Sequence, residues 1–234
     1  MTDPREKPEF DSLDAVRAQL VEAALPHVAF DGWTEATWRA AVADSGVDPV
    51  LASVACPRGG IDLARAFHLI CDARMAEALA ARDLSAIRFR DRVALAVRLR
   101  LEAAGDRETV RRGMTLFSLP SHAAEGTGLV WGTADAIWRA LGDTSTDLNW
   151  YSKRATLSGV FAATTLYWLG DDSAGSTATW EFLDRRIDGV MRVEKIKAGI
   201  RKTPVLRRLM AVQDRVAACV KAPAPRDDLP GRAV

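Results

Sequence analysis

Apolar residues recur at intervals of three and four along most of this chain, which is the spacing of one face of an α-helix. Between residues 13 and 30, for example, Leu13, Val16, Leu20 and Ala24 fall on one side. Alternating runs of β-branched residues are missing, whereas the helix-favouring Ala, Leu, Arg and Glu are abundant. We therefore predict an all-α protein, a bundle of about nine to ten helices.

Prolines, glycines and capping residues divide this pattern into elements. Pro26 is expected to bend or end the first helix, and Thr34 is a suitable N-cap for the second, over 34–44. Gly46 predicts a turn, after which Asp48 caps a short helix that ends before Pro57. Further helices are expected at 60–82, 85–104, 106–118, 121–141, 147–169, about 180–198 and 204–221, with a loop at 170–177.

These elements predict four parts. Residues 1–57 form a three-helix part, residues 58–200 a helical domain, residues 204–221 a separate terminal helix, and residues 222–234 a disordered tail. The polar first residues resemble neither a secretory signal nor a transit peptide, and no apolar run reaches the roughly 20 residues of a membrane span. We expect a cytoplasmic protein that at most lies on a membrane surface.

The three-helix part has the layout of a helix-turn-helix and resembles the N-terminal part of TetR-type regulators. A DNA reader needs basic residues near the phosphates, yet residues 33–56 carry a net charge of −2, with Arg39 as their one basic residue. The helix "DPVLASVA" offers no Arg, Asn or Gln to a base edge. We therefore expect a remnant scaffold that binds no nucleic acid.

No arrangement typical of a catalytic or metal site emerges. His68 precedes Cys71 and Asp72 by three and four residues, so a ligand face is conceivable, but a helix histidine with a satisfied ring nitrogen is the simpler interpretation. No Glu stands three residues before a His, as helical di-iron centres require. The pair Asp171–Asp172 is expected to face solvent. The sequence predicts a protein without catalytic residues, metal or cofactor.

The C-terminal region concentrates positive charge, with a net charge of +7 between residues 192 and 221. In the last helix, apolar residues share one side and arginines occupy much of the other, which is typical of a helix lying in a membrane interface. A helix docked on its own bundle explains the pattern equally well. The residues expected at a membrane are Val205, Leu206, Arg207, Arg208, Leu209, Met210, Val212 and Val216.

Three motifs in fixed order, "STD-x-NWY" with a basic pair after it, "TTLYWLGDDS" and "TWEFLDRRI", resemble the ninth Coq protein family. Its members are lipid-binding accessory proteins of ubiquinone biosynthesis. The resemblance is strongest over residues 119–188 and looser before them. Mitochondrial members carry a transit peptide that this sequence lacks, so the resemblance implies a bacterial member, peripheral on the inner face of the membrane.

The resemblance implies a TetR-like fold, a homodimer and an apolar cavity that holds an isoprenoid, a quinone intermediate or a phospholipid. It also implies a partner, the di-iron demethoxyubiquinone hydroxylase or another quinone-pathway enzyme, bound through Ile137, Trp150 and Tyr151. Trp150 also shares a helical face with Leu157 and Phe161, so a core role stays open. The candidate cavity residues are Leu116, Leu119, Leu157, Phe161, Leu166 and Phe182.

Two other functions stay open at this point. One is a ligand-responsive transcription regulator of the TetR type, which the acidic front end disfavours. The other is an enzyme in its own right, which requires a site that the sequence does not reveal.

Overall fold

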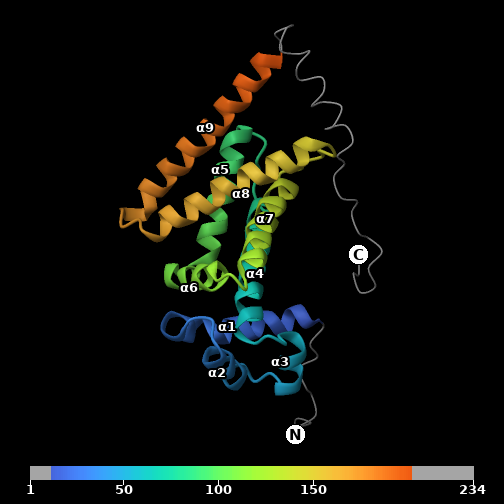
Figure 1. Ribbon diagram of the computed structural model, residues 1–234, viewed down its shortest axis with the longest axis vertical. Coiled ribbons are helices and arrows are strands. Elements are labelled where there is room, and N and C mark those ends of the chain that lie inside the picture. The colour runs from blue at the N-terminus through green and yellow to red at the C-terminus, as the bar shows by residue number, and fades with distance from the viewer. Residues whose placement is uncertain (1–11, 202–234) are drawn as a thin grey trace.

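The computed structural model describes residues 12–201, with side chains described as far as Val190. All regular elements in this range are helical, which confirms the predicted all-α class (Figure 1). The order is α1 (Leu13–Asp31), α2 (Glu35–Ser45), α3 (Pro49–Ala55), α4 (Gly60–Ala80), α5 (Phe89–Ala104), α6 (Arg107–Ser118), α7 (Ala123–Ala140), α8 (Leu148–Leu169), η1 (Ala174–Ser176) and α9 (Thr177–Arg201). The predicted helix over 204–221, its candidate membrane residues and the tail over 222–234 lie outside the described residues.

The predicted caps of the second and third helices are present. Thr34 accepts a hydrogen bond from the Thr37 amide, and the Asp48 carboxylate accepts from the amides of Val50 and Leu51. Gly46 turns the chain with φ of 69°, a conformation that suits glycine. Pro26, in contrast, does not end α1, which continues to Asp31.

Two hydrophobic cores are stacked along the molecule, and α4 belongs to both. The first core packs α1, α2 and α3 against the N-terminal half of α4, where Leu63 and Phe67 are buried. The second core packs the C-terminal half of α4, with Met75 and Leu79, against α5, α7, α8 and α9. Figure 1 shows α4 running from the three-helix part into the larger helical part. The predicted boundary near residue 57 therefore falls between two helices, α3 and α4, while the first core extends across it.

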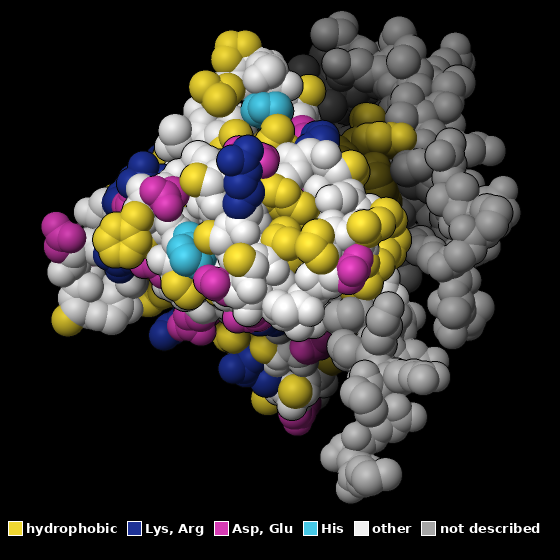
Figure 2. Space-filling view, turned by 90° about the horizontal axis from the view of Figure 1, so that it is seen from below, with side chains coloured by type: hydrophobic (Ala, Val, Ile, Leu, Met, Phe, Trp, Pro, Cys, Tyr) yellow, Lys and Arg dark blue, Asp and Glu magenta, His cyan; other side chains and the backbone are white. Residues whose placement is uncertain are grey.

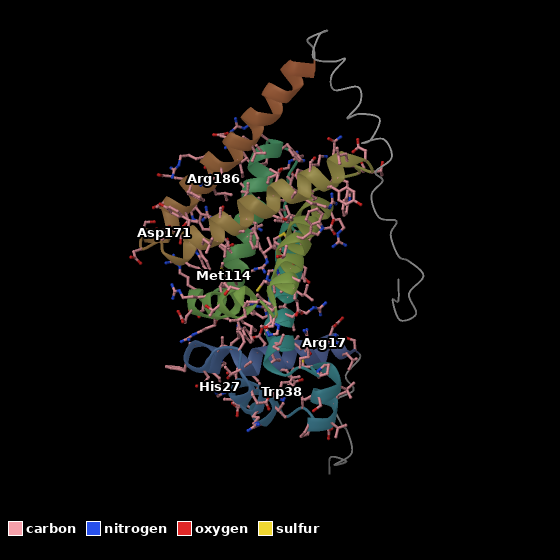
Figure 3. The ribbon with its side chains drawn as sticks, viewed as in Figure 1. Arg17, His27, Trp38, Met114, Asp171 and Arg186 are labelled. Atoms are coloured by element: carbon pink, nitrogen blue, oxygen red, sulfur yellow. The ribbon has the colours of Figure 1, made fainter. Side chains whose placement is uncertain are left out.

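The turn between α8 and α9 differs from the prediction, because Asp171 is buried and does not face solvent. Its carboxylate accepts hydrogen bonds from the Ser173 amide at 2.9 Å and from the Thr179 amide and hydroxyl at 2.9 and 2.5 Å. These bonds from Ser173 and Thr179 hold the pKa of Asp171 well below its usual range. The carboxylate thus fixes the start of α9, at the turn where Figure 3 labels it.

Within residues 12–201, no helix combines the length and the apolar character needed to cross a bilayer.

Candidate ligand cavity and partner surface

An apolar cavity lies among α4, α5, α6, α7 and α8, and Trp33 of the α1–α2 connection closes one side. It contains about 730 Å³ of unfilled space when the solvent at its mouth is included. The rings of Trp33 and Phe67 pack with their centroids 5.5 Å apart. Met114 of α6, labelled in Figure 3, is another lining residue. The principal lining side chains are Trp33, Phe67, Met114, Phe117, Leu129 and Phe161.

One wall of this cavity is polar. Arg100 of α5 donates from Nε to Asp72 Oδ1 at 2.5 Å and from Nη2 to the His68 carbonyl at 3.1 Å. Thr133 of α7 donates its hydroxyl to Asp72 at 2.9 Å. The guanidinium also lies 5.6 Å from the centre of the Phe161 ring. A buried ion pair with these extra hydrogen bonds tolerates an apolar surrounding.

His68 belongs to the same wall, and its ring nitrogen is satisfied as the simpler interpretation predicted. Nε2 lies 2.8 Å from Thr133 Oγ1 and 3.2 Å from the Leu129 carbonyl. Burial lowers the pKa of His68 to about 3, and the charge of Arg100 adds to this effect. The imidazole is therefore neutral at physiological pH. Burial raises the pKa of Asp72, against the opposing effect of Arg100.

Within the described residues, no group of three or more His, Cys, Asp or Glu side chains is placed to hold a metal ion.

A second groove lies between α5, α8 and α9. Its lining includes Leu157 and Val160 of α8, Val93 of α5, Ile187 of α9 and Trp138 of α7. Leu157, predicted to share a cavity with Phe161, therefore lines this groove, whereas Phe161 lines the first cavity.

The remaining predicted cavity residues line neither space. Leu116 packs against the first core, because the neighbouring positions Met114 and Phe117 occupy the cavity side of α6. Leu119 lies exposed in the turn after α6, and Leu166 is 61% exposed on the outer face of α8. Phe182 stacks on Tyr167, with ring centroids 4.5 Å apart. These four residues therefore lie outside both spaces, because helical spacing does not show which face of a helix borders unfilled space.

Three aromatic side chains gather where α7 meets the start of α8. The ring centroids of Trp150 and Tyr151 are 4.7 Å apart, and Trp131 of α7 lies 6.0 Å from Trp150 and 6.4 Å from Tyr151. All three are partly exposed, and none belongs to either core. We call Trp131, Trp150 and Tyr151 the aromatic surface. Trp131 is the member that sequence reasoning missed, because it comes from another helix.

Ile137, expected beside these two residues on a partner surface, is instead fully buried in the second core. It lies on the inner side of α7, so it does not contact a partner directly in this conformation.

The basic pair that follows the aromatic residues holds this region together. Arg154, only 2% exposed, donates from Nε to Asp135 at 2.6 Å and from Nη1 to Asp143 at 3.1 Å. Its guanidinium lies 4.0 Å from the centre of the Trp150 ring, a cation–π contact. Lys153 donates to the other oxygen of Asp143 at 2.7 Å. The pair therefore joins α7, α8 and their connection directly behind Trp150.

Asp143 is ionised in this network. Burial opposes its charge, but hydrogen bonds from Lys153, Ser145 and Arg154 outweigh burial and lower its pKa to about 2. The carboxylate thus keeps both basic side chains in place at neutral pH.

Comparison with known proteins gives a consistent result. Residues 123–194 match the COQ9 family model, which confirms the resemblance seen in the motifs. The chain is 32% identical over 198 residues to the mitochondrial ubiquinone biosynthesis protein COQ9 of Drosophila melanogaster, covering 82% of this chain and 60% of that protein. It is 28% identical over 212 residues to the Rattus norvegicus protein of the same name, covering 85% and 66%. The chain thus spans about 60% of the length of the Drosophila relative.

The fold is also found in a solved structure. A TetR transcriptional regulator from Nitrosomonas europaea superimposes with a TM-score of 0.61 over 74% of this chain and 96% of the regulator, at 18% identity. This confirms the predicted TetR-like fold, and at that identity the similarity concerns the fold alone.

Proposed function

We propose that this chain is a non-catalytic accessory protein of ubiquinone biosynthesis, which holds an isoprenoid, a quinone intermediate or a phospholipid and presents it to a partner enzyme. The similarity to proteins named for ubiquinone biosynthesis supports the pathway. The observation that carries the binding role is the apolar cavity, with four aromatic side chains among its lining residues. Moving an apolar chain from water into such a space gains about 0.8 kcal/mol for each buried methylene.

The matched segment supports a link between the cavity and a partner. Residues 123–194 include both a cavity wall, with Leu129 and Phe161, and the aromatic surface. Clustered, partly exposed Trp and Tyr side chains are the usual anchors of protein interfaces. We propose that the aromatic surface binds a quinone-pathway enzyme, with the di-iron demethoxyubiquinone hydroxylase as the first candidate.

Organic extraction of the purified protein, followed by lipid mass spectrometry, tests the binding role. We expect a near-stoichiometric isoprenoid, quinone precursor or phospholipid. A Met114→Trp variant, in which the larger side chain fills the cavity, is expected to retain several-fold less lipid at the same purity. Equal amounts of lipid in both proteins, or none in either, would remove the cavity from the proposal.

We further propose a homodimer that is peripheral on the inner face of a bacterial membrane and has no resident cofactor. Residues 204–221 are the proposed membrane contact, because of their basic amphipathic sequence. Flotation with vesicles that contain anionic phospholipid tests this role. The full chain is expected to float, and an Arg207→Glu, Arg208→Glu variant to remain in the soluble fraction. Light scattering of the purified protein measures the oligomeric state.

The regulator alternative finds no support on the face that a DNA reader uses. α3 exposes Val50 and Val54, at 74% and 59%, where a recognition helix needs polar groups for base edges. Figure 2 shows this end of the molecule, where hydrophobic side chains lie among acidic, basic and other side chains. A sequence-specific, salt-dependent shift of DNA by the purified protein would restore the regulator interpretation.

A further inference from the structure

The hydrogen bonds of His68 determine which ring nitrogen carries its proton. The Leu129 carbonyl, 3.2 Å from Nε2, accepts hydrogen bonds and never donates one, so Nε2 is the protonated nitrogen. Thr133 fits this assignment, because its oxygen accepts from Nε2 at 2.8 Å while its hydroxyl donates to Asp72 at 2.9 Å. Since the imidazole is neutral, Nδ1 has no proton and is a hydrogen-bond acceptor.

Arg100, which lines the same cavity, has a donor with no partner among the described residues. Its Nε and Nη2 bind Asp72 and the His68 carbonyl, and no residue in the described part of the chain accepts a hydrogen bond from Nη1. His68 Nδ1 likewise has no donor there. Neither atom is among the polar atoms that are fully buried without a partner. Both residues line the cavity, and each has one polar atom that no described residue pairs with.

A hydroxyl group is the simplest group that satisfies both atoms, because it donates one hydrogen bond and accepts another. We propose that this wall of the cavity binds the hydroxyl of an uncharged aromatic ring, a phenol, which donates to His68 Nδ1 and accepts from Arg100 Nη1. This inference rests on the proposed function of the cavity and names the chemical class of its ligand. Phe161, 5.6 Å from the guanidinium, and the Trp33–Phe67 pair offer apolar faces to such a ring.

The same wall disfavours other classes of ligand. Arg100 is already paired with Asp72, so a carboxylate or phosphate would add an unbalanced negative charge to a buried site. Such a group also brings only acceptors towards His68 Nδ1, itself an acceptor. An oxidised quinone or an aryl ether satisfies Arg100 but leaves His68 Nδ1 without a donor. An unmade hydrogen bond of this kind is costly in a buried site.

Two isomers test the proposal on the delipidated full-length protein. 4-Butylphenol and 4-propylanisole contain the same atoms, but only the phenol has a hydroxyl donor. By isothermal titration calorimetry we expect the phenol to bind about tenfold more tightly. Met114→Trp is expected to abolish binding of both, which places them in this cavity. 4-Butylbenzoate is expected to bind more weakly than the phenol.

A histidine variant assigns the preference to one atom. In His68→Gln, the side-chain amide keeps a donor near the position of Nε2 but has no acceptor in place of Nδ1. The phenol is expected to lose its tenfold advantage, while the affinity for 4-propylanisole stays unchanged. His27→Gln is the matched control, because His27 pairs with Asp44 on α2, away from the cavity. Its affinities are expected to equal those of the wild type.

Each result has a separate meaning. Equal affinity of the two isomers for the wild-type protein, or tighter binding of 4-butylbenzoate, would overturn the phenol assignment and leave a general apolar cavity. Binding of neither isomer, or binding that Met114→Trp does not reduce, would overturn both this inference and the lipid-holding role. The isomer comparison needs no variant, so it decides the question even if His68→Gln fails to fold.

Discussion

Replacement of Arg154 by methionine is expected to destabilise the protein strongly, although the residue lies next to a surface. Arg154 is 2% exposed and pairs with Asp135 and Asp143, so Arg154→Met leaves two carboxylates with one partner fewer. Removing one member of a buried ion pair costs about 3–5 kcal/mol. Lys153 still binds Asp143 at 2.7 Å, and Arg139 still binds Asp135 at 3.0 Å, which favours the lower end of that range.

A loss of about 3 kcal/mol corresponds to a decrease in melting temperature of about 6–12 °C for a protein of this size. Urea unfolding followed by circular dichroism measures the free energy, and a thermal scan measures the shift. The Trp150 ring also loses the guanidinium 4.0 Å from its centre. Partner binding is therefore expected to weaken even at temperatures where the variant is fully folded.

Arg139→Met is the matched control, because Arg139 pairs with the same carboxylate of Asp135 but is 66% exposed. An exposed pair contributes about 0–1 kcal/mol, so this variant should remain close to the wild type. If Arg154→Met lost no more stability than Arg139→Met, the network behind Trp150 would not hold α7, α8 and their connection together.

Three further predictions concern the partner surface, pH dependence and close packing. Trp150→Asp is expected to weaken capture of the proposed partner hydroxylase about 30-fold without unfolding, whereas Phe30→Asp, at an exposed residue at the other end of the molecule, is expected to leave capture unchanged. Because the pKa of Asp143 falls from 3.8 to about 2 on folding, its stabilisation is complete above pH 4 and is lost as pH falls to 2. Acid titration of stability should therefore show a decrease that Asp143→Asn lacks. Gly60→Ala brings a Cβ to 2.7 Å from two backbone carbonyl oxygens and should cost about 1–3 kcal/mol by urea unfolding, whereas Gly132→Ala, in open space, should not.

The sequence predicts the elements of this fold well, because their signals are local. Thr34 and Asp48 cap helices through atoms two or three residues away, and Gly46 turns the chain by its own conformation. Pro26 misleads as a stop signal, because the packing of α1 in the first core stabilises the helix on both sides of it. The burial of Asp171 was missed for a related reason, because its partner Thr179 lies eight positions later, in α9.

The site depends on how the helices pack, and the sequence carries less of that information. Periodicity places Leu157 and Phe161 on one face of α8, but Phe161 lines the cavity beside α6 and Leu157 lines the groove beside α9. Trp131 joins Trp150 only through the crossing of α7 and α8. His68 and Arg100 are 32 residues apart in the chain, so their shared wall has no sequence signature.

The place of Trp33 makes the three-helix part a component of the cavity. This residue belongs to the three-helix part, yet its ring is buried in the cavity wall and its indole donates to the Thr109 carbonyl of α6 at 3.3 Å. Deleting the first 57 residues would therefore not leave a smaller self-contained helical domain. It would remove one wall of the cavity and expose the apolar N-terminal half of α4, so the cavity and the three-helix part depend on each other structurally.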